Sequence, residues 1–180
     1  MKYLKLFENF ESYDPYELMI IPPNKKAEMI VREIRKDEPN LNLVSDLITL
    51  GANLDWQDED NGNRTPLHWA AWRGRVEIAR MLIDAGANLD IQDDQGQTPL
   101  HWAAKYGREE IARMLIGAKA DVNVQDKWGS TPLHGAARWG YEEISKMLIG
   151  AGANKDVQDN KGLYPYDLTS NQELKNLLQA

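Results

Sequence analysis

The tetrapeptide Thr-Pro-Leu-His occurs three times, at residues 65–68, 98–101 and 131–134, and successive copies begin 33 residues apart. Aligned at that offset, residues 65–97 and 98–130 are identical at 21 of 33 positions, and residues 98–130 and 131–163 at 20. A fixed period of this length is the signature of a repeat architecture, in which each unit buries its apolar surface against its neighbours. The 180-residue chain is therefore expected to form one domain with a continuous core.

Each repeat has the sequence signals of two helices and a projecting loop. Threonine is a preferred N-cap, and proline suits the first helical position, where its missing N–H costs nothing. Gly74 and its equivalents can supply the positive φ of a tight turn between the helices. The second helix has an apolar stripe expected to be core, and residues 90–96 read as an extended turn, a finger, with glycine near its tip. In the first repeat the stripe is Ile78, Met81, Leu82 and Ile83.

This layout resembles the ankyrin repeat, through the tetrapeptide, the two glycines, the Gly-Ala-Asn/Asp segment and the 33-residue period, over about residues 24–180. The resemblance implies an all-α ankyrin-repeat solenoid of stacked helix-turn-helix units with projecting β-turn fingers. It also implies a non-catalytic protein that mediates protein–protein interaction, with its concave and finger surface as the contact face. The three histidines would form hydrogen bonds within and between the turn segments.

The repeat pattern divides the chain into four parts. Residues 1–23 form an N-terminal extension, 24–57 two N-terminal capping helices, 58–163 three central repeats, and 164–180 a C-terminal capping repeat. In the last part Ser170 and Glu173 are spaced for a capping box at the start of a final helix. Lys119 replaces the glycine that ends the second helix in the other repeats, which predicts a left-handed residue there.

Composition limits the function. The net charge is −7 with both signs interspersed, which disfavours a nucleic-acid partner that is tracked through its phosphates. There are no cysteines, so disulfides and thiolate metal sites are excluded. No run of about 18 apolar residues predicts a membrane span, and the first residues lack the apolar segment of a secretory signal, so a cytoplasmic protein is expected.

The sequence offers no catalytic, metal or cofactor site. His68, His101 and His134 recur at one repeat position, so they should form a ladder with steps of about 8 to 10 Å and cannot meet at one ion. The acidic first finger, residues 58–64, lacks the glycine and glutamate positions of a calcium loop. We therefore predict that the protein is not an enzyme and needs no cofactor.

Positions that vary between repeats predict the binding site. Each first helix ends in one aromatic residue and one cation, and stacking in register should align these pairs as two stripes beside the fingers. Aromatic residues and arginine dominate interface hot spots. Gly135 replaces the tryptophan found at 69 and 102, which predicts a notch beside Trp139 that anchors a partner. The candidate partner-binding residues are Arg64, Trp72, Arg73, Lys105, Tyr106, Trp128, Gly135, Arg138 and Trp139.

Three classes of partner stay open. The cations favour an acidic protein segment, whereas aromatic and cationic stripes also suit single-stranded nucleic acid, and the notch also suits a small anion such as a nucleotide. The sequence leaves a homo-oligomer open as well. The aromatic start of the chain, Met1 to Glu11, is faintly similar to the leader of some tailed-phage proteins, which would make the protein virus-encoded.

Overall fold

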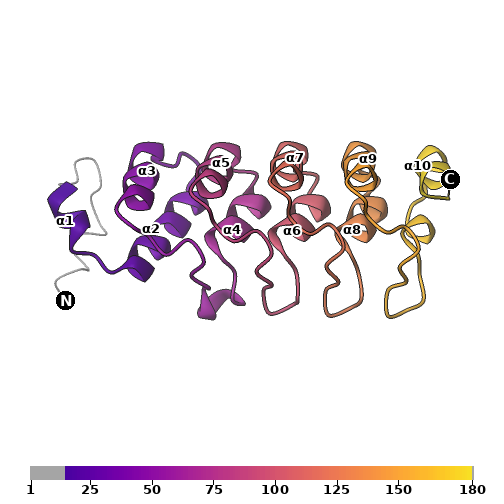
Figure 1. Ribbon diagram of the computed structural model, residues 1–180, viewed down its shortest axis with the longest axis horizontal. Coiled ribbons are helices and arrows are strands. Elements are labelled where there is room, and N and C mark those ends of the chain that lie inside the picture. The colour runs from indigo at the N-terminus through magenta and orange to yellow at the C-terminus, as the bar shows by residue number, and fades with distance from the viewer. Residues whose placement is uncertain (1–14, 180) are drawn as a thin grey trace.

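The computed structural model describes residues 15–179, which form a row of helical hairpins with loops projecting from one side (Figure 1). Within that part of the chain no β-strand occurs, so the expected all-α repeat solenoid is confirmed. The helices are α1 (Pro15–Met19), α2 (Pro23–Arg35), α3 (Leu41–Thr49), α4 (Pro66–Arg73), α5 (Val76–Asp84), α6 (Pro99–Lys105), α7 (Glu109–Gly117), α8 (Pro132–Trp139), α9 (Glu142–Gly150) and α10 (Gln172–Gln179), with 3₁₀ helices η2 (Glu59–Asn61) and η3 (Pro165–Asp167).

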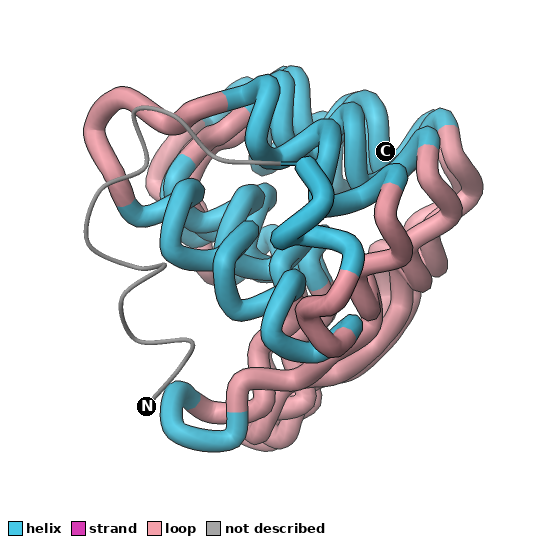
Figure 2. Tube along the Cα trace, turned by 90° about the vertical axis from the view of Figure 1, so that its left-hand side faces the viewer, coloured by secondary structure: helices cyan, strands magenta, loops and turns pink. Residues whose placement is uncertain are grey.

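The hairpins stack in register. The inner helices α2, α4, α6 and α8 pack on one another in one row, and the outer helices α3, α5, α7 and α9 in a second. Viewed along the stack, successive hairpins and fingers nearly superimpose (Figure 2). Residues 33 positions apart therefore occupy equivalent places in neighbouring repeats.

A histidine fixes the start of each inner helix and ties it to the next finger. In α4, Nδ1 of His68 accepts the backbone N–H of Thr65 at 3.1 Å, so the ring proton lies on Nε2. That Nε2–H donates to the carbonyl oxygen of Gln97 in the following finger, at 2.9 Å. His101 and His134 make the same two contacts, with the carbonyls of Ser130 and Leu163. The bonding that the resemblance implied is therefore present in all three repeats.

The second, third and fourth fingers are each held by a buried aspartate. Oδ1 of Asp93 accepts the N–H groups of Gln95 and Gln97, which closes the loop on itself. Asp126 and Asp159 repeat this arrangement in the next two fingers. Backbone hydrogen bonds then join neighbouring fingers, such as Lys127 N–H to the carbonyl of Gln95 at 3.0 Å. From the second finger onward, the row of fingers is consequently as regular as the row of helices.

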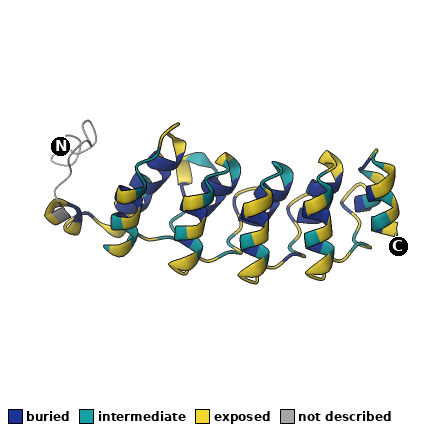
Figure 3. Ribbon diagram, turned by 90° about the horizontal axis from the view of Figure 1, so that it is seen from above, coloured by how far each residue is buried: buried dark blue, intermediate teal, exposed yellow. Residues whose placement is uncertain are grey.

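The apolar stripe of the outer helices supplies only part of the core. Ile78 and Leu82 are buried, as are their equivalents, and the buried surfaces face neighbouring hairpins (Figure 3). Met81 and Ile83, expected to be core, are half-buried and pack against its edge. They lie on the flanks of the stripe, and each side chain is only partly covered.

The N-terminal hairpin of the stack, α2 and α3, is held by contacts that the central repeats do not share. Buried Lys26 in α2 donates to the carbonyl of Leu50 at 2.6 Å, which satisfies the end of α3. Leu18 of α1 is fully buried against this hairpin. The rest of the predicted N-terminal extension, including the phage-like segment Met1 to Glu11, lies outside the described residues.

The C-terminal helix is capped one residue later than expected. Asn171, not Ser170, accepts the N–H groups of Glu173 and Leu174 through Oδ1, at 2.9 and 3.1 Å. Asparagine and serine are both good N-caps, so the residue type alone could not fix the register. Just before it, Asp167 accepts the N–H of Tyr164 and so takes the role that histidine has in the other repeats.

We expect Lys119→Gly to stabilise the protein. Lys119 has φ of 72°, a left-handed conformation that costs a residue with a Cβ about 1–2 kcal/mol. Glycine relieves that strain but gains entropy in the unfolded chain, so a net gain of about 0.5–1 kcal/mol is expected from urea unfolding. Lys119→Ala keeps the Cβ and is the matched control. An equal gain in both variants would show that strain is not the cause.

The histidine ladder predicts that stability falls in mild acid. Burial lowers the pKa of His68 to about 4 and also lowers the pKa values of His101 and His134, which keeps the three imidazoles neutral at pH 7. Between pH 6.5 and about 4 the unfolded chain therefore binds more protons than the folded one. This stabilisation is complete above pH 6.5 and decreases on acidification, by about 1.4 kcal/mol per pH unit for each imidazole that titrates only when unfolded.

Urea unfolding at pH 7, 6 and 5 measures the effect, because these are the three histidines of the chain. In the folded protein the C2–H resonances of all three imidazoles should titrate at lower pH than in the unfolded chain, with that of His68 near pH 4. A free energy of unfolding that stays constant or rises from pH 7 to pH 5 would contradict the assigned tautomers.

Candidate binding face

The predicted partner-binding residues lie together on one side of the stack. We call this surface the inner face: the exposed sides of α4, α6 and α8 together with the fingers at the N-terminal ends of these helices. Its two halves differ in exposure. Trp72 and Tyr106 near the N-terminal end are half-buried against the core, whereas Trp128 and Trp139 near the C-terminal end are 52% and 59% exposed.

The N-terminal half of the inner face is filled by the protein's own aromatic rings. Trp69 and Trp102 are buried, and their ring centroids lie 5.3 and 6.1 Å from that of Trp72. Tyr106 stacks on Trp102 with centroids 5.7 Å apart and an angle of 16° between the planes. Contacts of this kind stabilise aromatic pairs beyond the area that they bury. Trp72 and Tyr106 thus present only part of their rings to a partner.

Several predicted binding cations lie over these rings. The guanidinium carbon of Arg64 is 4.4 Å from the centroid of Trp102, and Nζ of Lys105 is 5.6 Å from the same ring. Arg73 lies 5.1 Å from the ring of Trp72. Cations within about 6 Å of an aromatic face are attracted by its quadrupole. Arg64 is consequently held back against the stack and does not project from its finger.

The two buried tryptophans differ in their polar contact. Nε1–H of Trp102 donates to Oδ2 of Asp93 at 3.0 Å. Nε1 of Trp69 is buried without a hydrogen-bond partner. The aspartate of its finger, Asp58, receives the side-chain amide of Asn61 on Oδ2 instead, at 2.9 Å. Asn61 belongs to the two-residue insertion region that forms η2, so the longer first finger accounts for the unpaired indole.

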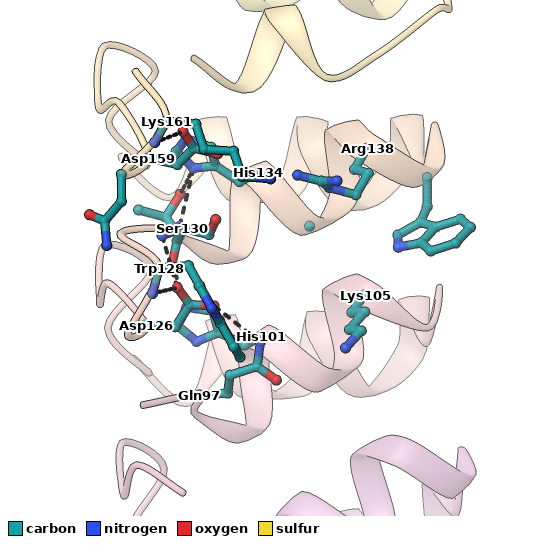
Figure 4. A pocket seen from close by; sticks show the side chains of 14 residues that line it. Gln97, His101, Lys105, Asp126, Trp128, Ser130, His134, Arg138, Asp159 and Lys161 are labelled. Carbon is teal, nitrogen blue, oxygen red and sulfur yellow. Dashed lines mark hydrogen bonds between the residues drawn. The ribbon is translucent and has the colours of Figure 1, made fainter. Parts of the chain in front are cut away.

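A cavity of about 350 Å³ opens on the C-terminal half of the inner face, where the sequence predicts a notch (Figure 4). Gly135 forms part of its wall, and a Cβ built there would meet only the backbone and Cβ of Lys105 at 3.6–3.9 Å. The space lies between α6, α8 and the fingers that follow them. The further lining residues are Gln97, His101, Asp126, Trp128, Ser130, Thr131, His134, Arg138, Trp139, Asp159, Asn160 and Lys161.

The cavity combines a cationic rim with acidic groups on its finger side. Lys105, Arg138 and Lys161 contribute the positive charges, while Asp126 and Asp159 are buried. Burial raises the pKa of Asp159, but the N–H groups of Leu163 and Lys161 outweigh that effect and keep the pKa below its ordinary value. Both aspartates also anchor their own fingers, so their carboxylates are fixed in position.

Sequence reasoning missed three features of this site. The aromatic cluster that holds Trp72, the aspartates that line the cavity, and the finger residues Asn160 and Lys161 at its far side were not singled out. The aspartates carry a repeat signal, because residues 93, 126 and 159 are identical at the 33-residue offset. That signal shows a common structural role and gives no hint that two of them border an open space.

The histidines beside the inner face are engaged in holding the scaffold together. Across residues 15–179, no three His, Cys, Asp or Glu side chains gather in a way that suits a metal ion. Each histidine of the ladder is neutral and has both ring nitrogens engaged in the bonds described above.

Among residues 15–179, none of the helices has the length and apolar character needed to cross a bilayer.

Comparison with known proteins agrees with the repeat geometry. A family model described as ankyrin repeats, in three copies, matches residues 34–126 and 92–159. Among curated proteins, the E3 ubiquitin-protein ligase KEG of Arabidopsis thaliana is 39% identical over 72 residues. That match covers 39% of this chain and 4% of the ligase, so the chain spans only a small part of that relative.

The unequal bonding of the two buried indoles gives a testable difference. We expect Trp102→Phe to destabilise the protein by about 1–3 kcal/mol more than Trp69→Phe, because only the former breaks a hydrogen bond to a carboxylate. The two substitutions remove the same atoms from equivalent places in neighbouring repeats. Free energies of unfolding in urea measure the difference, and equal losses would contradict the bonding pattern.

Proposed function

Because the chain belongs to the ankyrin-repeat family, whose repeats generally mediate protein–protein interaction and which is typically non-catalytic, we propose that it binds a partner protein through its inner face. The observation that carries this proposal is the pair of exposed tryptophans, Trp128 and Trp139, on either side of the Gly135 cavity. Large aromatic side chains beside a pocket are typical of interface hot spots. A partner would therefore make its strongest contacts at α6, α8 and their fingers.

The charges of the same region favour an acidic partner segment. Arg138 is exposed and Lys105 and Lys161 stand near it around the cavity, on a chain whose net charge is −7. Complementary charge speeds association and sets the register of a complex more than it adds affinity. The tryptophans would supply most of the binding energy, and the cations would select the sequence around the contact.

The two alternative ligand classes fit the cavity less well. A nucleotide or other small anion in the Gly135 notch would meet the buried carboxylates of Asp126 and Asp159. Single-stranded nucleic acid needs a series of rings on which bases stack, whereas Trp72 and Tyr106 are partly covered by the protein's own cluster. A protein segment can place an apolar or donor group in the cavity and its acidic groups at the rim.

We further propose that the protein has no catalytic activity of its own. The imidazoles of the ladder, which are its best acid–base candidates, have lowered pKa values and hold the fold together through both ring nitrogens. A general base must be free to reach a substrate proton. The histidines instead stabilise the scaffold that presents the inner face.

We expect the double substitution Trp128→Ala and Trp139→Ala to abolish partner capture. Affinity capture from the source cells, followed by binding measurements on the captured protein, compares wild type with this variant. Each truncation should weaken binding about tenfold or more, because exposed hot-spot tryptophans contribute about 2 kcal/mol or more. Both side chains are largely exposed, so the unfolding midpoint should change little.

Arg113→Ala on the outer helix α7 is the matched surface control and should leave capture unchanged. Binding is also measured between 50 and 200 mM salt. An affinity that falls about a thousandfold or more over that range would point to nucleic acid and away from an aromatic protein contact. Full capture by the double tryptophan variant would show that the partner binds elsewhere.

A further inference from the structure

The Gly135 cavity occupies the place of an indole ring one repeat earlier. Residue 135 is equivalent to residue 102 at the 33-residue offset, and the repeats stack in register. The surroundings correspond as well. Each residue around Trp102 has an equivalent 33 positions later that lines the cavity: Gln97 corresponds to Arg64, Lys105 to Trp72, Asp126 to Asp93, Arg138 to Lys105, and Trp139 to Tyr106.

Trp102 shows how this environment holds an indole. Its Nε1–H donates to the carboxylate of Asp93 at 3.0 Å, and its ring stacks on Tyr106 with centroids 5.7 Å apart. The cations Arg64 and Lys105 lie 4.4 and 5.6 Å from the ring centroid. A buried carboxylate, an aromatic neighbour and a cation therefore contact one ring at once.

The same three kinds of group border the cavity. Asp126 takes the place of Asp93, Arg138 that of Lys105, and Trp139 that of Tyr106. Oδ1 of Asp126 is held by the N–H groups of Trp128 and Ser130, while its Oδ2 accepts only the amide of Gln97, at 3.1 Å. Figure 4 shows the Asp126 carboxylate and Gln97 on the finger side of the site, with Lys105 and Arg138 on the helices. One acceptor oxygen thus remains able to take a second donor.

We propose that the cavity receives a tryptophan side chain of the partner protein, with its indole N–H donating to Oδ2 of Asp126 and Arg138 over its ring. This inference rests on the proposed function and names the chemistry of the contact. The cationic rim of Lys105, Arg138 and Lys161 places the tryptophan in an acidic segment of the partner.

Size and polarity select tryptophan over other side chains. A volume of about 350 Å³ lies near the lower end of the 300–1,000 Å³ of small-ligand pockets, so it suits one large side chain. Phenylalanine and leucine would fill it without a donor for Asp126 and would leave Oδ2 with the amide of Gln97 as its one partner. A lysine would satisfy the carboxylate but has no ring face for Arg138 and Trp139 to contact.

The test uses N-acetyltryptophanamide as the probe and the backbone amide of Gly135 as the reporter. In ¹⁵N–¹H spectra of the full chain, we expect saturable shifts at Gly135 and at the neighbouring amides of Trp128 and Ser130, with a Kd on the order of 1 mM. N-Acetyl-1-methyltryptophanamide, which lacks the indole N–H, and N-acetylphenylalaninamide should bind about tenfold more weakly. No saturable shift at Gly135, or equal binding of all three probes, would overturn the proposal.

Two substitutions at one position separate filling of the cavity from damage to the fold. Gly135→Trp restores the indole of the preceding repeats and should abolish probe binding while the unfolding midpoint is kept or raised. Gly135→Ala adds a Cβ that makes only ordinary contacts with Lys105 and should retain most of the binding. Probe binding that survives in a folded Gly135→Trp variant would place the probe elsewhere.

Asp126→Asn tests the carboxylate. The amide can keep the Oδ1 acceptor for the finger but turns the other group into a donor, which faces the indole N–H. We expect it to weaken N-acetyltryptophanamide about tenfold and to leave N-acetylphenylalaninamide unchanged. An equal effect on both probes would assign Asp126 a purely structural role.

Failure of this inference can be told apart from failure of the proposed function. If Gly135→Trp still captures the partner while the Trp128→Ala and Trp139→Ala variant does not, the inner face binds the partner and the tryptophan contact is wrong. If wild type is a dimer that Gly135→Trp converts to a monomer, the occupant belongs to a second copy of the chain, which overturns the assignment to a partner protein. Light scattering measures this second outcome.

Discussion

The neutral histidine at the start of each inner helix is the contact on which the rest of the structure depends. Its Nδ1 accepts the backbone N–H of the N-cap threonine of its own helix, and its Nε2 donates to a carbonyl 29 residues further along the chain. One ring therefore fixes both the local turn and the position of the next repeat. Burial lowers the pKa of the ring, and the neutral ring is the form that leaves Nδ1 able to accept this N–H. The fingers, the stacking register and the inner face all follow from this repeated contact.

Because the repeats are held in register, the two halves of the inner face have the same backbone and differ only in their side chains. Toward the N-terminus, four rings and the cations above them cover the inner face. Toward the C-terminus, glycine replaces one indole, and the neighbouring tryptophans extend into solvent. The same backbone thus carries a filled surface and an open one. A scaffold of this kind changes its binding properties without changing its fold, since exposed positions contribute little to the core.

The features set by the 33-residue period could be predicted from the sequence. The features that depend on the direction of a side chain were predicted less accurately. The helices, the capping threonines, the left-handed Lys119 and the notch at Gly135 all follow from comparing repeats on a fixed skeleton. Trp72 occupies a variable position, yet its ring turns toward Trp69 and Trp102, and a linear pattern does not contain that direction. Ser170 and Asn171 are both good caps one residue apart, so residue preference could not choose between them.

The Gly135 cavity differs from an arbitrary surface cavity because it lies where the equivalent position of the preceding repeat holds a packed ring. A cavity made by truncating a packed ring keeps those neighbouring groups that also serve the scaffold: Asp126 holds its finger and His134 caps its helix. These groups cannot relax into the space without breaking the stack. The cavity therefore stays open. Around it remain the hydrogen-bonding groups and charges that would surround an indole at this position. A partner that supplies the same side chain would restore contacts for which the site is already arranged, so little ordering entropy would oppose its binding.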